Sequence, residues 1–191
     1  MSKQKISGPA LFMYAVILIT VITAAVCFGF YYSGASQSKT VLWVGIVAFM
    51  IVYHFWGRII MGNVSKLFKI NQDHWWFREK PFEKGLYKLL RVKKWKGKAL
   101  TYNPEAFSLE KHTLSEIAAV MTKSEVDHWI NEVISLVSIL FSILWGELWI
   151  FVLTAIFAMI FDAQFIVIQR YNRPRILRII KRQSRKTKEL V

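Results

Sequence analysis

Residues 129–168 read WINEVISLVSILFSILWGELWIFVLTAIFAMIFDAQFIVI. Two apolar runs, rich in Leu, Ile, Val and Phe, lie on either side of a short turn at Gly146-Glu147. The first run, from about Trp129 to Trp145, is short. The second, 148–168, reaches the roughly 20 residues that an α-helix needs to cross a bilayer. The stretch therefore predicts a helical hairpin that crosses a membrane twice.

Two further apolar runs precede this hairpin, at about 10–32 and 40–61. Lys3 and Lys5 before the first run resemble the start of a signal peptide, but the run is far longer than the about 7–15 residues of a signal-peptide core. We therefore expect it to be a retained helix. With 54% hydrophobic residues, the chain is too apolar for an ordinary soluble domain. The predicted class is an all-α integral membrane protein with four transmembrane helices.

The charges of the chain predict its orientation. Lys and Arg number 26 against 12 Asp and Glu, and basic flanks on apolar spans indicate a membrane protein rather than one that binds nucleic acid. The 62–128 segment holds 13 cations against 8 acids, and the 169–191 tail holds 9 against 1. Both termini and the middle segment are therefore predicted to be cytoplasmic in a multi-pass cell-membrane protein. The predicted parts are a transmembrane pair at 1–61, an interfacial segment at 62–128, a hairpin at 129–168 and a basic tail at 169–191.

The middle segment contains two predicted helices. Aromatic residues alternate with cations at 74–96, HWWFREKPFEKGLYKLLRVKKWK, and its leucines favour one short amphipathic helix in the membrane interface. Pro81 suits the first turn of that helix and Gly97 suits its end. A second helix is predicted to begin near Ser108 or Thr113, because Glu116 lies three residues after Thr113 in the pattern of a capping box.

An ordered set of polar residues marks the entrance to the third span. At 100° per residue, Glu125, His128 and Glu132 lie within about 60° of one another on a helix. Glu132, Asp162 and His54 each lie 14 or 15 residues from the outer end of their span, which predicts one layer about 21 Å deep. Ionisable groups at such depth are costly and favour a functional role.

Two chemistries suit this layer. A histidine oriented by a carboxylate is a general base for acyl transfer to a hydroxyl, with His128 as the base and Glu125 or Glu132 as its partner. Two histidines with carboxylates also suit a metal site, although only one E-x-x-H pattern is present. The structural alternatives are a hydrated helix start and a hydrogen-bonded cluster that holds helices together.

Two basic clusters are candidate substrate-binding sites. They suit the phosphate of an acyl donor such as acyl-CoA, or the acidic face of an acyl carrier protein. The alternative is that they bind anionic membrane lipids, with each cation contributing about 1 kcal/mol to the attraction. The candidate residues are Arg91, Lys94, Trp95 and Lys96 in the first cluster and Arg170, Tyr171, Asn172, Arg173 and Arg175 in the second. Because Pro174 disfavours continuation of a helix, the second cluster is expected where span four ends.

Three motifs together resemble the glycosyl-4,4'-diaponeurosporenoate acyltransferase family: RVKKWK at 91–96, MTKSEVDHW at 121–129 and IVIQRYNRPRILRI at 166–179. The resemblance extends over roughly residues 50–178. It implies an integral membrane enzyme that transfers a fatty acyl chain to a sugar hydroxyl of a glycosylated carotenoid acid, as in staphyloxanthin-type pigment synthesis. The matching positions are Arg91, Lys94, Trp95, Glu125, His128, Trp129, Gln169, Arg170, Tyr171, Asn172, Arg173 and Pro174.

The sequence thus favours an acyltransferase that acts on a lipophilic acceptor at the inner membrane face, without a bound cofactor. The expected partners are membrane lipids, an acyl donor and the acceptor. The alternatives are a membrane scaffold, a small transporter, and a metalloenzyme that uses His54, His128 and carboxylates. A transporter would show interrupted helices in repeated halves, and the sequence has no such symmetry.

Overall fold

A computed structural model describes residues 8–99 and 104–189. Every regular element in these two ranges is helical. Four helical stretches are long and apolar enough to cross a membrane: α1 (Gly8–Tyr32), α2 (Lys39–Val64), the stretch Leu114–Trp145, and α7 (Leu148–Glu189). The predicted all-α class with four membrane-length helices is confirmed. Lys3 and Lys5 lie outside the described residues.

The chain forms two compact units. The first contains the chain up to Lys66 and residues Ile130–Asp162, and the second contains Leu67–Trp129 and the chain from Ala163 onward. Helices α5 and α7 therefore contribute residues to both units. The division into membrane and cytoplasmic parts at residues 61, 128 and 168 stays a prediction.

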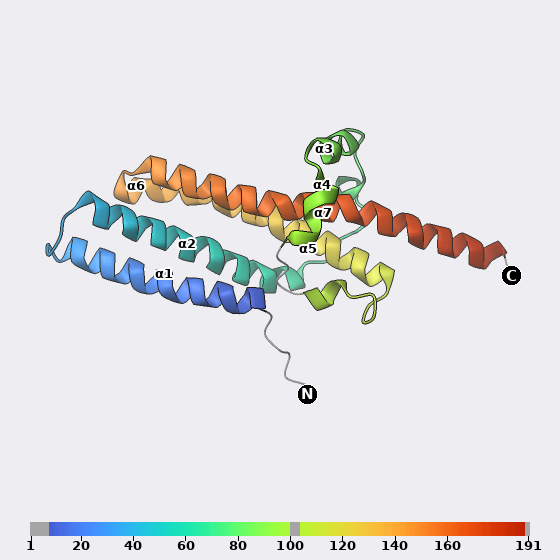
Figure 1. Ribbon diagram of the computed structural model, residues 1–191, viewed down its shortest axis with the longest axis horizontal. Helices are drawn as coiled ribbons and strands as arrows, with labels where there is room; N and C mark the ends of the chain where they lie inside the picture. The colour runs from blue at the N-terminus through green and yellow to red at the C-terminus, as the bar shows by residue number, and fades with distance from the viewer. Residues whose placement is uncertain (1–7, 100–103, 190–191) are drawn as a thin grey trace, which may run out of the picture. The chain divides into compact units, whose positions relative to one another are not determined.

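In the first unit, α1 and α2 run antiparallel and side by side, joined by a short turn (Figure 1). Gly34 in this turn has φ +80°, and the Ser38 side chain caps α2 by accepting from the Thr40 amide. A Cβ at Gly45 would approach Phe28 to 3.1 Å. Gly45 thus allows α1 and α2 to pack closely, as small residues do between helices in membranes.

The second half of the first unit is the predicted hairpin. Helix α5 (Leu114–Val137) continues through η5 (Ser138–Phe141) into α6 (Ser142–Trp145), and Gly146 reverses the chain with φ +74° before α7. The core of the unit contains Leu42, Ile46 and Met50 from α2, with Ile150 and Phe151 from α7. Leu42, Ile46 and Met50 recur every four residues, so one face of α2 is buried in the core.

The predicted capping box is confirmed. The Thr113 hydroxyl accepts from the Glu116 amide at 3.3 Å, and the Glu116 carboxylate accepts from the Thr113 amide at 2.7 Å. Two backbone donors at the helix start are satisfied in this way. Helix α5 therefore begins at Leu114, and the helix that carries span three starts well before Trp129.

The 74–96 stretch of the middle segment does not form the single amphipathic helix that its sequence predicts. Helix α3 (Glu83–Leu89) ends at Leu90, Arg91 has φ +51°, and α4 (Val92–Trp95) follows in a new direction. An L-residue in this left-handed conformation breaks the helix at a cost of about 1–2 kcal/mol. Short 3₁₀ turns complete the segment: η1 (Ser65–Leu67), η2 (Trp75–Phe77), η3 (Lys96–Lys98) and η4 (Pro104–Phe107).

The expectation that the helix stops at Pro174 is wrong, because α7 continues through it to Glu189. A proline inside a helix removes one backbone hydrogen bond and costs about 3 kcal/mol. Arg170 and Arg173, just before the proline, are held by ion pairs to Glu83 and Glu125. These contacts join the helical turn before the proline to α3 and α5.

Candidate functional site

A buried ion network lies at the centre of the second unit. Glu125 on α5 is fully buried, and each of its two carboxylate oxygens accepts from a different arginine of α7. Arg170 and Arg173 donate to these oxygens at 2.6 Å each. Both arginines belong to the predicted donor-binding cluster at 170–175, and both contact Glu125, the first residue of the polar set at 125–132.

The network continues to α3 and to the 75–78 segment. Arg170 also donates to Glu83 at 2.6 Å, and the Tyr87 hydroxyl donates to the other oxygen of Glu83 at 2.8 Å. The backbone carbonyls of Trp76 and Phe77 accept from the two arginines. Burial, and then the hydrogen bond to Glu83, raise the pKa of Tyr87 above its ordinary value.

This network pairs two carboxylates with two guanidiniums, so its charges balance inside the protein. Glu125 was predicted to orient His128, and Arg170 and Arg173 were predicted to bind donor phosphate. The structure gives all three residues internal partners instead. Their predicted roles stay untested, and the geometry assigns them to holding α3, α5 and α7 together.

A basic cleft of about 520 Å³ lies between α3, α4 and α7. Of the predicted donor-binding residues, Arg91, Lys94 and Arg175 line it, together with the ring of Tyr171. The guanidinium of Arg175 lies 3.4 Å from the centre of that ring, a cation–π contact. The lining also contains four cations outside the predicted donor-binding set, together with Glu79 and Tyr87: Lys84, Lys88, Lys93 and Arg178.

Three other predicted donor-binding residues, Trp95, Lys96 and Asn172, lie one or two positions along the chain from residues that line the cleft. The indole of Trp95 donates to the Leu90 carbonyl at 2.8 Å, and the Lys96 ammonium donates to Asn172 at 2.6 Å. Burial lowers the pKa of Lys96, and the nearby charge of Arg175 lowers it further. The Lys96–Asn172 bond joins the end of α4 to α7.

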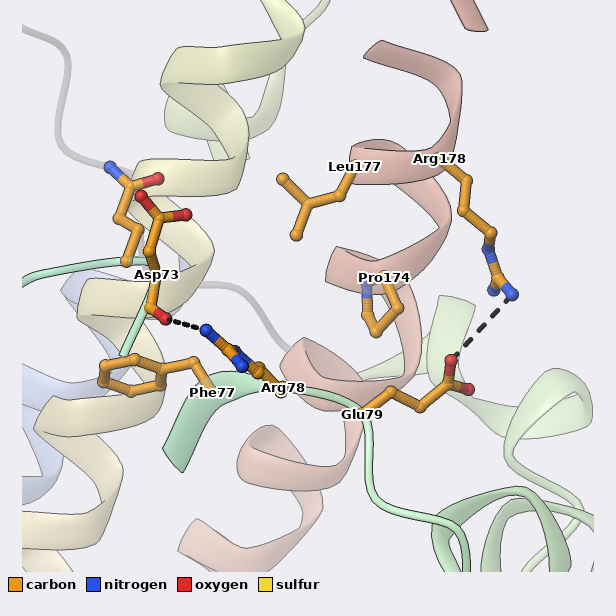
Figure 2. Close-up of a pocket in the computed structure, with 8 residues that line it drawn as sticks. Asp73, Phe77, Arg78, Glu79, Pro174, Leu177 and Arg178 are labelled. Atoms are coloured by element: carbon orange, nitrogen blue, oxygen red, sulfur yellow. Dashed lines mark hydrogen bonds and ion pairs between the residues drawn. The ribbon is translucent and has the colours of Figure 1, made fainter. Parts of the chain in front are cut away.

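A second cleft, of about 440 Å³, is lined by polar and apolar side chains together (Figure 2). Figure 2 shows Asp73 and Phe77 on one side, and Pro174, Leu177 and Arg178 of α7 on the other. Arg78 donates to the Asp73 carbonyl at 3.5 Å. Clefts of this size accept small ligands or parts of larger ones.

His128, the predicted base, packs its imidazole flat against Phe165, with ring centres 4.7 Å apart and planes at 9°. It is half-buried, and it lines neither the basic cleft nor the second cleft. Glu132 lies one helical turn further along α5 and is buried in the first unit. Glu125, His128 and Glu132 all lie on α5, as the sequence predicts, but none of them lines either cleft.

The predicted polar layer is present in the first unit. His54, Glu132 and Asp162 are each buried. Asn131 donates to Asp162 at 3.4 Å, and the Ser135 hydroxyl lies 3.5 Å from Nδ1 of His54. These contacts join Asp162 and His54 to α5, and a functional role of the layer stays a prediction.

Arg58 is the residue of this layer that sequence reasoning missed. Its guanidinium forms an ion pair with Asp162, donates to the His54 carbonyl at 2.8 Å and lies 5.2 Å from the Phe161 ring centre. The signal was a single cation inside the apolar run 40–61, because an intramembrane cation needs a counter-ion. The ion pair joins α2 to α7.

The metal alternative lacks a ligand set in the described part of the chain. In the ranges 8–99 and 104–189, no three His, Cys, Asp or Glu side chains are grouped so that they could hold a metal ion. A zinc or iron site needs at least three such ligands.

Comparison with known families identifies the chain. The profile of the glycosyl-4,4'-diaponeurosporenoate acyltransferase family matches residues 73–182, more than half of the 191 residues. The chain belongs to this family. No curated protein matches the chain, and no solved structure does.

The acyltransferase match covers the ion network of the second unit but only part of the polar layer of the first unit. The match contains the ion network and nearly all of the lining of both clefts. It also contains Glu132 and Asp162, but it stops short of His54 and Arg58 on α2. The matched range therefore contains α3, α4, α5 and the part of α7 up to residue 182. The family indicates acyl transfer to a carotenoid glycoside.

Proposed function

We propose that this protein transfers a fatty acyl group from a phosphate-bearing carrier to a hydroxyl of a lipophilic carotenoid glycoside, at the cytoplasmic face of the cell membrane. The observation that carries the proposal is the basic cleft inside the family match. Seven of its ten lining residues are Lys or Arg. Guanidinium and ammonium groups bind phosphate oxygens with short, charge-assisted hydrogen bonds.

The donor follows from this charge. Acyl-CoA and acyl carrier protein both carry the acyl group as a thioester on a phosphate-bearing pantetheine arm, and either would bring phosphate to the cleft. Tyr87 and Tyr171 pack edge to face with ring centres 5.3 Å apart, and both line the cleft. They supply apolar surface beneath the cations for the arm.

The lipophilic acceptor suits a chain with four membrane-length helices. Its apolar part would lie in the bilayer, and its sugar would reach the surface. The face follows from the cation-rich middle segment and tail, since such segments stay on the cytoplasmic side. A base must take the proton of the attacking hydroxyl. His128 is the candidate that the sequence predicts, but it lines neither cleft. The carboxylates that do line a cleft, Asp73 and Glu79, are therefore also candidates.

Charge reversal tests the donor site. Lys94 is exposed in the basic cleft, so Lys94→Glu should leave the fold intact and raise the Kd for CoA about tenfold or more, the effect of losing one charge-assisted hydrogen bond of about 1.5–3 kcal/mol. The matched control is Lys186→Glu, an exposed tail cation outside the cleft, which should bind as the wild type does. Binding is measured by titration calorimetry on protein in lipid nanodiscs.

Three donors distinguish the sources of the acyl group: acyl-CoA, acyl carrier protein thioester and an acyl phospholipid. Transfer from either thioester supports the proposal. Transfer from the phospholipid alone would contradict the pantetheine donor. Equal CoA affinity in Lys94→Glu and Lys186→Glu would contradict the assignment of the cleft.

A further inference from the structure

The two clefts of the second unit share one wall. Glu79 and Arg178 are the two residues that line both. Their side chains face each other, with Arg178 Nη1 3.9 Å from Glu79 Oε2, as Figure 2 shows for the side of the smaller cleft. Glu79 and Arg178 can therefore each contact a group bound in either cleft.

The chemistry of the two clefts differs. The basic cleft suits an anion, as argued above. The smaller cleft has two carboxylates, Asp73 and Glu79, and two guanidiniums, Arg78 and Arg178, so its charges balance. The Gln72 amide and the apolar residues Phe77, Pro174 and Leu177 complete its lining. Carboxylates and amides accept hydrogen bonds from hydroxyls, and a flat apolar surface packs against the face of a sugar ring. The smaller cleft therefore suits a neutral polyhydroxyl group.

Glu79 differs from the two buried acids of this unit in its partners. Glu83 and Glu125 are buried in ion pairs of 2.6 Å, whereas the side chains of Glu79 and Arg178 are 26% and 53% exposed and 3.9 Å apart. A partly exposed pair at this distance contributes little to stability. Glu79 is also the one acid that lines the basic cleft within the described residues.

We propose that the smaller cleft binds the sugar of the acceptor. Glu79, which lines both this cleft and the donor cleft, is the catalytic base, and Arg178 stabilises the oxyanion. This rests on the proposed acyl transfer. It names the place where acceptor and donor meet and the residue that takes the proton.

The reaction step balances with an acyl thioester as the donor. The Glu79 carboxylate takes the proton from a sugar hydroxyl as the hydroxyl oxygen attacks the thioester carbonyl carbon. The carbonyl oxygen becomes negative beside the Arg178 guanidinium, which stabilises it. The intermediate then collapses, the carbon–sulfur bond breaks, and the thiolate takes the proton from Glu79. The products are a sugar ester and a free thiol, and Glu79 is again a carboxylate.

Replacement of Glu79 tests the base. Glu79→Gln keeps the size and polarity of the side chain but cannot accept the proton. The single-turnover rate of acyl transfer should fall by about 10²–10⁴-fold, with donor affinity within about twofold of the wild type. The matched control is Glu110→Gln, an exposed acid outside both clefts, which should retain the wild-type rate. An unchanged melting temperature in Glu79→Gln would show that the loss is chemical.

Two further variants distinguish the roles. Asp73→Asn should raise the KM for the glycoside severalfold, with kcat changed by less than about threefold, because the neutral amide accepts a weaker hydrogen bond from the sugar than the carboxylate does. His128→Gln should keep the transfer rate within about threefold. A wild-type rate in Glu79→Gln, or a loss confined to His128→Gln, would overturn the inference and leave the proposed function standing. A wild-type protein that transfers from none of the donors would overturn both.

Discussion

The acids and arginines of the second unit are used in two ways that their residue types alone do not reveal. Glu83, Glu125, Arg170 and Arg173 have short, buried ion pairs, and loss of one partner would leave a charge in a dry environment. Glu79 and Arg178 have a long, exposed pair, and they remain accessible to a ligand. Partners and exposure therefore separate residues that build the unit from residues that face its clefts.

Tyr87 tests the structural side of this distinction. Its hydroxyl donates to Glu83, so Tyr87→Phe should lower the free energy of unfolding by about 1.5–3 kcal/mol at neutral pH. Because the folded state raises the pKa of Tyr87, its stabilising effect is fully present below about pH 10, the unfolded pKa, and is lost as pH rises further. Denaturation in detergent at pH 7 and pH 10.5 measures both effects. A variant as stable as the wild type at pH 7, with the same alkaline loss, would contradict this account.

At the scale of elements, helices α2 and α7 are joined by a charge pair inside a membrane-length stretch. Arg58 lies four residues after His54 on α2, and it pairs with Asp162 of α7. Neither charge is favourable alone at that depth, and together they satisfy each other. The ion pair is a structural reason for an ionisable residue in each of these two apolar runs. A catalytic role is not needed to explain them.

A double-mutant comparison tests this reading of the pair. Asp162→Leu alone leaves the buried guanidinium of Arg58 without its carboxylate and should destabilise the protein by about 3–5 kcal/mol. Arg58→Met combined with Asp162→Leu removes both charges and should recover most of that loss. Unfolding in mixed micelles measures the three proteins. A double variant no more stable than the single one would show that the two residues are not coupled.

At the scale of the whole molecule, length and apolarity predicted the four helices, and the Thr113–Glu116 pattern predicted where α5 begins. Equal residue counts also predicted that His54, Glu132 and Asp162 share a polar layer. The sequence could not indicate that Glu125 would meet Arg170 and Arg173, because those contacts depend on which helices are neighbours. The break at Arg91 was also hidden, since arginine rarely adopts a positive φ. Glu79 was missed because its place between two clefts is a property of the folded unit.

The measurement that tests the central claim most directly is acyl transfer by the wild-type protein in nanodiscs. Purified protein receives a glycosylated carotenoid acid of the kind in the family's name and a labelled acyl-CoA or acyl carrier protein thioester. Mass spectrometry of the extracted lipid should show the glycoside with one added acyl group and an equal amount of free thiol. Folded protein that leaves the glycoside unmodified with both thioesters would contradict the account.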